Sequence, residues 1–117
     1  MERLALAVPI QPGKTETFRA YVQELQDTRR AEEEAFHRSV GTRRESAWLQ
    51  QTPQGDLAVL YWEGEDAERY KKGLEQLLRG DDAFGAWVRE RFADLYGIDP
   101  SGPLPPLPEP VLELRFD

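Results

Sequence analysis

The chain contains no cysteine, only three lysines and one histidine among its 117 residues. Without cysteine there is no disulfide, no thiol nucleophile and no thiolate metal site. Long hydrophobic runs are also missing, and no segment reaches the roughly 18 residues needed to cross a bilayer. No basic region precedes the apolar start of the chain, which predicts a cytoplasmic protein without a secretory signal. The chain also has no excess of basic residues. Its net charge is −7, which argues against a nucleic-acid partner.

The composition that remains is typical of one globular domain spanning residues 1–117. Hydrophobic residues make up 39% and charged residues 32% of the chain, which suits a folded protein of this length. One segment is biased: residues 100–110 hold six of the nine prolines. We predict an extended connector there, and presentation of a polyproline ligand to another protein is the alternative.

Hydrophobic periodicity predicts seven elements in the order β-α-β-β-α-α-β. Apolar residues alternate with a period of two over 4–10, 44–52, 57–63 and 111–116, which predicts four strands. Helical spacing predicts three helices, from Lys14 to Ser39, from the acidic start at 64–66 to Gly80, and from 81–82 to Gly97.

A short loop rich in turn residues joins the two middle strands. Pro53 and Gly55 predict a three-residue hairpin loop. In the resulting register Trp48 lies opposite Leu60 and on the same face as Trp62. A slip of one residue would exchange the two faces.

With right-handed crossovers, this order predicts a ferredoxin-like α+β fold. Its four-stranded antiparallel sheet has the strand order 4-1-3-2 and carries the helices on one face. Three helices cover only one side of a sheet whose central strands are apolar on both faces. A second copy is the simplest cover for the other side, so we predict a homodimer that forms an α+β barrel. Whether 111–116 pairs within its own sheet or on the partner's stays open.

Two stretches resemble a known superfamily. The sequence from Trp62 to Ala67, WEGEDA, resembles the W-E-(S/D)-x-E-A-F segment of the antibiotic-biosynthesis-monooxygenase superfamily. The sequence DAF at 82–84 resembles the S-D-x-F that starts the next helix in its haem-degrading branch, and VPIQPGKTETFRAYV at 8–22 is similar to its first strand, turn and helix. The whole chain looks closest to an uncharacterised bacterial family of this type. The resemblance implies the ferredoxin-like fold, the dimer and a ligand cleft between sheet and helices in each subunit.

The residues do not support haem ligation at the place where that branch binds haem, which leaves haem binding only as a third hypothesis. Its axial histidine lies four residues after the helix phenylalanine, where this chain has Val88. The only histidine, His37, lies on the first predicted helix, so we expect no haem and no other cofactor. The branch's catalytic tryptophan matches Trp62.

Aromatic residues are the best candidates for contact with a ligand, because apolar clefts with a few polar groups bind small molecules. The predicted ligand-binding residues are Tyr21, Trp48, Tyr61, Trp62 and Trp87, and filling of the core is the alternative for each. His37 is the candidate general base. Its spacing from Glu33 and Glu34 includes the Glu-x-x-His pattern of di-iron bundles, but a single copy on a charged helix predicts an ion pair and no metal site.

These patterns together predict a homodimeric α+β barrel with a small apolar cleft in each subunit. Its sharpest form is a cofactor-independent monooxygenase that takes a small apolar or aromatic ligand. A non-catalytic dimeric binding or interaction module is the alternative.

Overall fold

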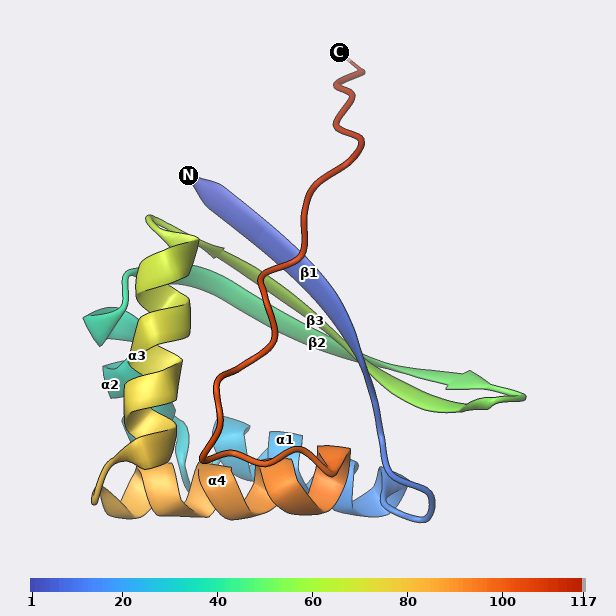
Figure 1. Cartoon of the computed structure of the whole chain (residues 1–117), viewed down its shortest axis with the longest axis vertical. Coiled ribbons are helices and arrows are strands. Elements are labelled where there is room, and N and C mark those ends of the chain that lie inside the picture. Colours follow the sequence, from blue (N-terminus) through green and yellow to red (C-terminus); the bar gives the residue numbers. More distant parts are fainter. Residues whose placement is uncertain (117) are drawn as a thin grey trace.

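A computed structural model describes residues 1–116 and shows one antiparallel sheet with helices packed on one side of it (Figure 1). The strands pair in the order β1-β3-β2. In chain order the elements are β1 (Glu2–Pro9), α1 (Thr15–Gln26), α2 (Arg30–Ser39), β2 (Thr42–Thr52), β3 (Gly55–Gly64), α3 (Ala67–Arg79) and α4 (Ala83–Tyr96). The mixed α+β class is confirmed and is compatible with a ferredoxin-like fold. None of the helices within residues 1–116 has both the length and the apolarity that a membrane span requires.

The helix starts and stops read from the sequence in the second half are confirmed. Asp66 caps α3, and its carboxylate accepts hydrogen bonds from the backbone N–H groups of Glu68 and Arg69. Asp82 caps α4 in the same way through the N–H of Phe84. Gly97 ends α4 in the left-handed conformation, with φ of 65°, which residues with a Cβ adopt at a cost.

The single helix predicted from Lys14 to Ser39 is wrong, because the chain forms α1 and α2 with a break at 27–29. Asp27 and Thr28 are poor helix formers, and the backbone N–H of Asp27 bonds back to the end of α1. A straight helix of these residues would be about 39 Å long, and its second half would leave the sheet. The break lets α2 turn back and contact β2.

The predicted hairpin register is wrong by one residue. Thr52 pairs with Gly55, so the loop has two residues, and Trp48 lies opposite Val59. The Thr52 hydroxyl donates to the carbonyl of Gly55 and accepts from the N–H of Gln54, and these bonds favour the tighter loop. Trp48 therefore lies on the face away from the helices and is 56% exposed.

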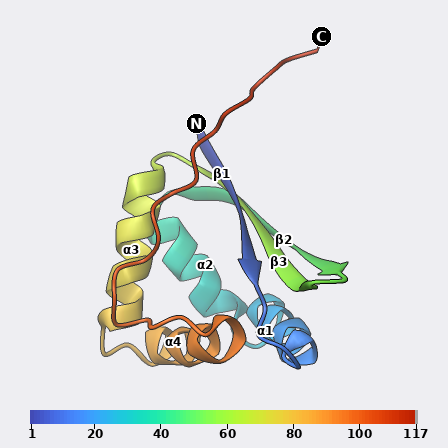
Figure 2. The same cartoon turned by 45° about the vertical axis from the view of Figure 1, so that its right-hand side comes forward.

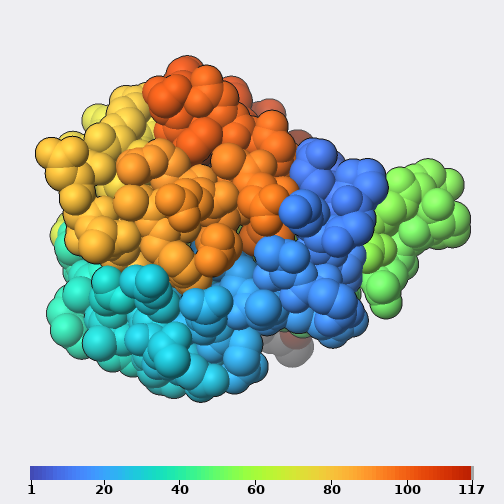
Figure 3. Space-filling model, turned by 90° about the horizontal axis from the view of Figure 1, so that it is seen from below, coloured from blue at the N-terminus to red at the C-terminus, as the bar shows by residue number. Residues whose placement is uncertain are grey.

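The two faces of the sheet differ sharply in burial. On the helix side Leu4, Ala58 and Trp62 are buried, and the helices form a closed layer below them (Figure 3). A further cluster of buried residues links this side of the sheet to α1, α3 and α4: Ile10, Phe18, Tyr21, Ala58, Leu78, Phe84, Trp87, Val88 and Leu95. None of the helices in the described part of the chain covers the opposite face, which stands free in Figure 2. We call it the outer face; its central residues are Ala5, Ala7, Trp48, Leu57, Val59 and Tyr61.

The predicted fourth strand, Val111–Phe116, is not paired with any strand in the described chain. The proline-rich connector runs along α3, where the N–H of Leu104 donates to Glu75, and then carries 111–116 beyond the end of β1 (Figure 1). One ion pair, between Arg3 and Glu113, links the two segments. The segment adds no strand to its own sheet, so residues 1–116 of a single chain show three strands and not four.

Candidate functional site

The single histidine lies between α2 and the sheet. Its position in the last turn of α2 turns the ring toward β2, and only 13% of the side chain is exposed. The sequence interpretation placed this residue on a solvated helix face. The break before α2 is the reason for the difference, because it brings the end of α2 against the strands.

Two carboxylates converge on one nitrogen of the His37 ring. Glu33, one turn earlier on α2, places Oε1 3.4 Å from Nε2. Glu45, on β2, places Oε2 3.0 Å from the same atom. Both distances suit charge-assisted interaction with a protonated ring.

The other ring nitrogen is held by a hydroxyl. Nδ1 of His37 lies 2.7 Å from Oγ1 of Thr42, and this oxygen also accepts a hydrogen bond of 2.8 Å from Nε1 of Trp62. The protonated ring donates to Thr42, whose oxygen then satisfies two buried donors. A β-bulge at Arg43 allows Thr42 and Glu45 to face the helices together.

Stacked aromatic rings complete the site. Tyr70 of α3 stacks on both His37 and Trp62, with its ring centroid 6.0 Å and 4.9 Å from theirs and with nearly parallel planes. Phe36 contacts the imidazole edge-on at 5.1 Å. These rings exclude water from one side of the imidazole and fix its plane. We call Glu33, His37, Thr42, Glu45, Trp62 and Tyr70 the histidine cluster.

Burial and charge act in opposite directions on this histidine. Burial alone would lower the pKa of His37, but the hydrogen bonds and charges of Glu33 and Glu45 outweigh it and raise the pKa to about 9. Burial also raises the pKa of Glu33 and that of Tyr70. In the metal-free protein at neutral pH, His37 therefore carries a proton and is suited to donate one rather than to accept one.

The predicted ligand-binding residues lie in three separate places. Tyr21 and Trp87 pack together in the core, with centroids 5.3 Å apart. Trp62 belongs to the histidine cluster. Trp48 and Tyr61 lie on the outer face. The structure thus joins His37 with Trp62 and leaves Trp48 and Tyr61 on the other side of the sheet, while Thr42 and Glu45 were missed by sequence reasoning.

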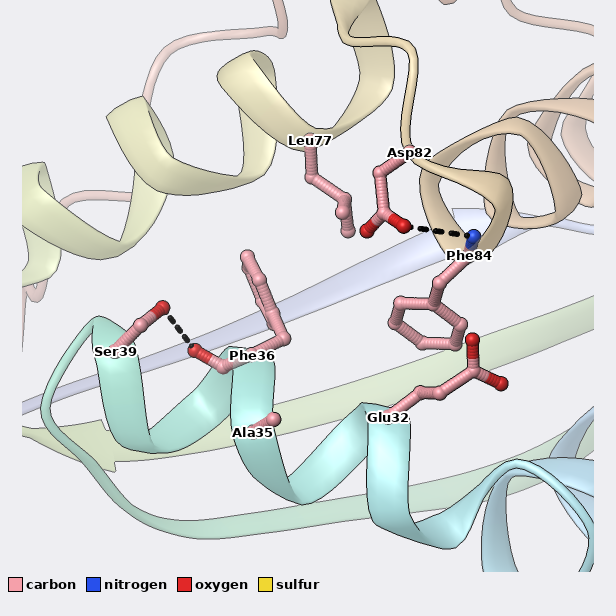
Figure 4. A pocket seen from close by; sticks show the side chains of 7 residues that line it. All are labelled: Glu32, Ala35, Phe36, Ser39, Leu77, Asp82 and Phe84. Atoms are coloured by element: carbon pink, nitrogen blue, oxygen red, sulfur yellow. Dashed lines mark hydrogen bonds between the residues drawn. The ribbon is translucent and has the colours of Figure 1, made fainter.

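Two open depressions lie on the described surface. One, of about 280 Å³, lies between α2, the end of α3 and the start of α4; Phe36, Leu77 and Phe84 line it, and Glu32 and Asp82 lie at its rim (Figure 4). The other, of about 740 Å³, lies between the loop after β1 and the tip of the β2–β3 hairpin. Neither contains any of the five predicted ligand-binding rings.

The comparisons with known proteins add no relative. No family model, no curated protein and no solved structure matches the chain significantly. The superfamily resemblance therefore stays a prediction from the sequence.

Proposed function

We propose that the protein acts as a homodimeric interaction module, with the outer face of the sheet as the interface between two copies. The observation that carries this proposal is the apolar character of a face that no helix covers. Trp48 is 56% exposed there, and Leu57, Val59 and Tyr61 are only partly buried. Each large apolar side chain gains about 1.5–3 kcal/mol when it is fully buried, so together they favour association.

The shape of the outer face favours a second copy as the occupant. Along β1 the face carries the small residues Ala5 and Ala7, whereas β2 carries the bulky Trp48. A two-fold axis between the sheets and parallel to the strands places β1 of one copy opposite β2 of the other. Trp48 of each copy then fits over the alanines of the other.

The charges on the outer face argue against the other possible axis, the one that runs across the strands. Arg3, Glu63 and Arg44 form one row at a single end of the face. An axis parallel to the strands keeps the two charged rows together at a wet margin. An axis across the strands would place each charged row on the apolar end of the other copy, at a desolvation cost.

The segment 111–116 is part of the same proposal. The outer face measures about 15 by 25 Å, or roughly 400 Å², which is below the approximately 800 Å² per partner of a stable interface. Val111, Leu112, Leu114 and Phe116 are 63–89% exposed and supply the missing apolar area. Within residues 1–116 neither sheet edge, β1 or β2, carries a fourth strand, so the segment can pair with an edge of the second copy.

Sedimentation velocity on the full chain tests the interface. We expect a dimer at 10 μM, and Trp48→Lys should weaken it by at least 100-fold because it buries a charge in an apolar contact. Gln76→Lys, on the exposed side of α3, is the matched control and should leave the dimer intact. A wild-type chain that stays monomeric at 100 μM contradicts the proposal.

A second pair of variants tests the segment. Leu114→Asp should weaken the dimer, whereas Ser101→Asp, in the exposed connector, should not. If Trp48→Lys dissociates the dimer and Leu114→Asp leaves it unchanged, the outer face is the interface and the segment is not part of it.

The monooxygenase alternative is supported by one observation, the contact of His37 and Trp62 through Thr42 and Tyr70. This places the ring of the single histidine, a group that can transfer a proton, beside an aromatic side chain. Oxygen uptake in the presence of polyphenolic aromatic compounds tests it, with Trp62→Phe as the variant. Uptake equal to that of a heat-denatured control removes this alternative.

A further inference from the structure

The histidine cluster gathers three potential metal ligands from two elements of the fold. Nε2 of His37 and one oxygen each of Glu33 and Glu45 all lie within 4.8 Å of one another. Glu33 and His37 are one turn apart on α2, and Glu45 reaches them from β2. The site therefore depends on the packing of helix against strand and not on one solvated helix face.

The distances between these atoms fit a coordination sphere. Ligands about 2.1 Å from a metal are about 3.4 Å apart in tetrahedral and about 3.0 Å apart in octahedral geometry. Nε2 of His37 lies 3.4 Å from the Glu33 oxygen and 3.0 Å from the Glu45 oxygen. Two of the three spacings thus suit a small cation as they stand, and the two carboxylate oxygens lie within 4.8 Å of each other.

The residues around His37 hold its ring in an orientation that suits metal binding through Nε2. A histidine that binds a metal through one nitrogen usually donates its other N–H to an oxygen that fixes the ring. Here Thr42 Oγ1 lies 2.7 Å from Nδ1, and Tyr70 stacks on the ring. A proton on Nδ1 leaves the Nε2 lone pair directed at the two carboxylates.

Charge and exposure indicate which kind of ion would bind. Two carboxylates and one neutral imidazole carry two negative charges, which matches a divalent cation. Imidazole with carboxylate suits zinc, manganese or iron(II) better than calcium or magnesium. The Glu45 side chain is 40% exposed, so a bound ion would keep a position open to water or to a small anionic ligand, as three-ligand sites do.

We propose that Glu33, His37 and Glu45 bind one divalent first-row transition-metal ion through Nε2 and two carboxylate oxygens. This proposal is independent of the dimer. The alternative is that Nε2 carries a proton instead of a metal, so that the three residues form an imidazolium between two carboxylates.

Zinc titration by calorimetry on the full, tag-free chain, stripped with a chelator first, tests the proposal. We expect one zinc per chain with a dissociation constant of 10 μM or lower. Glu45→Gln preserves shape on a partly exposed side chain and should weaken binding at least tenfold. Glu34→Gln is the matched control on α2, because that carboxylate pairs with Arg30 instead, and it should bind zinc as the wild type does.

The single histidine gives a second readout. Nitrogen-15 NMR of the imidazole should show a resonance shift at Nε2 on addition of zinc, with Nδ1 still protonated. Absence of saturable binding up to 1 mM zinc, an unchanged His37 spectrum at saturation, or equal losses for Glu45→Gln and Glu34→Gln would each overturn the proposal.

Discussion

Replacing Thr42 by valine tests whether the histidine cluster is held together as the structure indicates. Valine has nearly the shape of threonine but no hydroxyl. Thr42→Val therefore leaves the packing in place and removes the one oxygen that both His37 Nδ1 and Trp62 Nε1 contact, at 2.7 and 2.8 Å.

The expected loss follows from the burial of the two groups that lose their partner. Trp62 is 2% exposed and the His37 side chain 13%, so water replaces the hydroxyl poorly at either nitrogen. A buried polar group left without a partner costs about 1–3 kcal/mol, whereas the better strand propensity of valine returns a few tenths of a kcal/mol. With two such groups, we expect Thr42→Val to lower the free energy of unfolding by about 2–6 kcal/mol.

Thr42→Ser is the matched control, since it keeps the hydroxyl and loses one methyl group, at about 1 kcal/mol. Urea unfolding followed by circular dichroism, at one fixed protein concentration because association would add to stability, gives both values. A Thr42→Val protein that is as stable as Thr42→Ser would refute the view that this oxygen satisfies two buried donors.

Three more perturbations follow from the same contacts. In metal-free protein the pKa of His37 is raised from 6.5 to about 9, so its stabilising contribution is complete below about pH 6.5 and is lost as pH rises through 9. The free energies of unfolding at pH 6 and pH 9 should therefore differ by up to about 3 kcal/mol in the wild type. A His37→Gln protein with the same difference would contradict this. Gly64→Ala would place a Cβ 2.3 Å from the Trp62 ring, and a loss of about 2 kcal/mol or more should appear as a lower melting temperature; an unchanged one argues against the close approach. Asp66→Ala removes the cap of α3 and should cost about 1 kcal/mol in the same melt, while Asp66→Asn should cost less; equal losses would mean that the cap bonds are unimportant.

Local signals in the sequence predicted much of the second half of the fold. Asp66, Asp82 and Gly97 marked helix ends correctly because caps depend on residues within one turn. The strands at either side of the hairpin were also visible from their alternation. The register between them was not, because the hydrogen bonds of the Thr52 hydroxyl favour the shorter loop, and a change of one residue in loop length exchanges the face on which Trp48 lies.

The two helices before β2 show a similar limit. Apolar residues at helical spacing stop at Leu25 and resume at Ala31, and this short gap by itself did not predict a break. Asp27 and Thr28 weaken the helix only modestly, and the gain from packing α2 on the sheet favours the break. That gain comes from a tertiary contact, which a short stretch of sequence does not reveal.

The histidine cluster depends on one feature of β2 that the sequence pattern hides. Thr42 and Glu45 are three residues apart, and in a regular strand such residues point to opposite faces. The bulge at Arg43 adds one residue to β2 opposite β3, because Thr42 pairs with Gly64 while Arg44 pairs with Glu63. Both side chains consequently reach His37 from the same face. A prediction from regular strand alternation places one of the two side chains on the wrong face, whichever register is chosen. The histidine cluster can therefore be recognised only when the bulge is known.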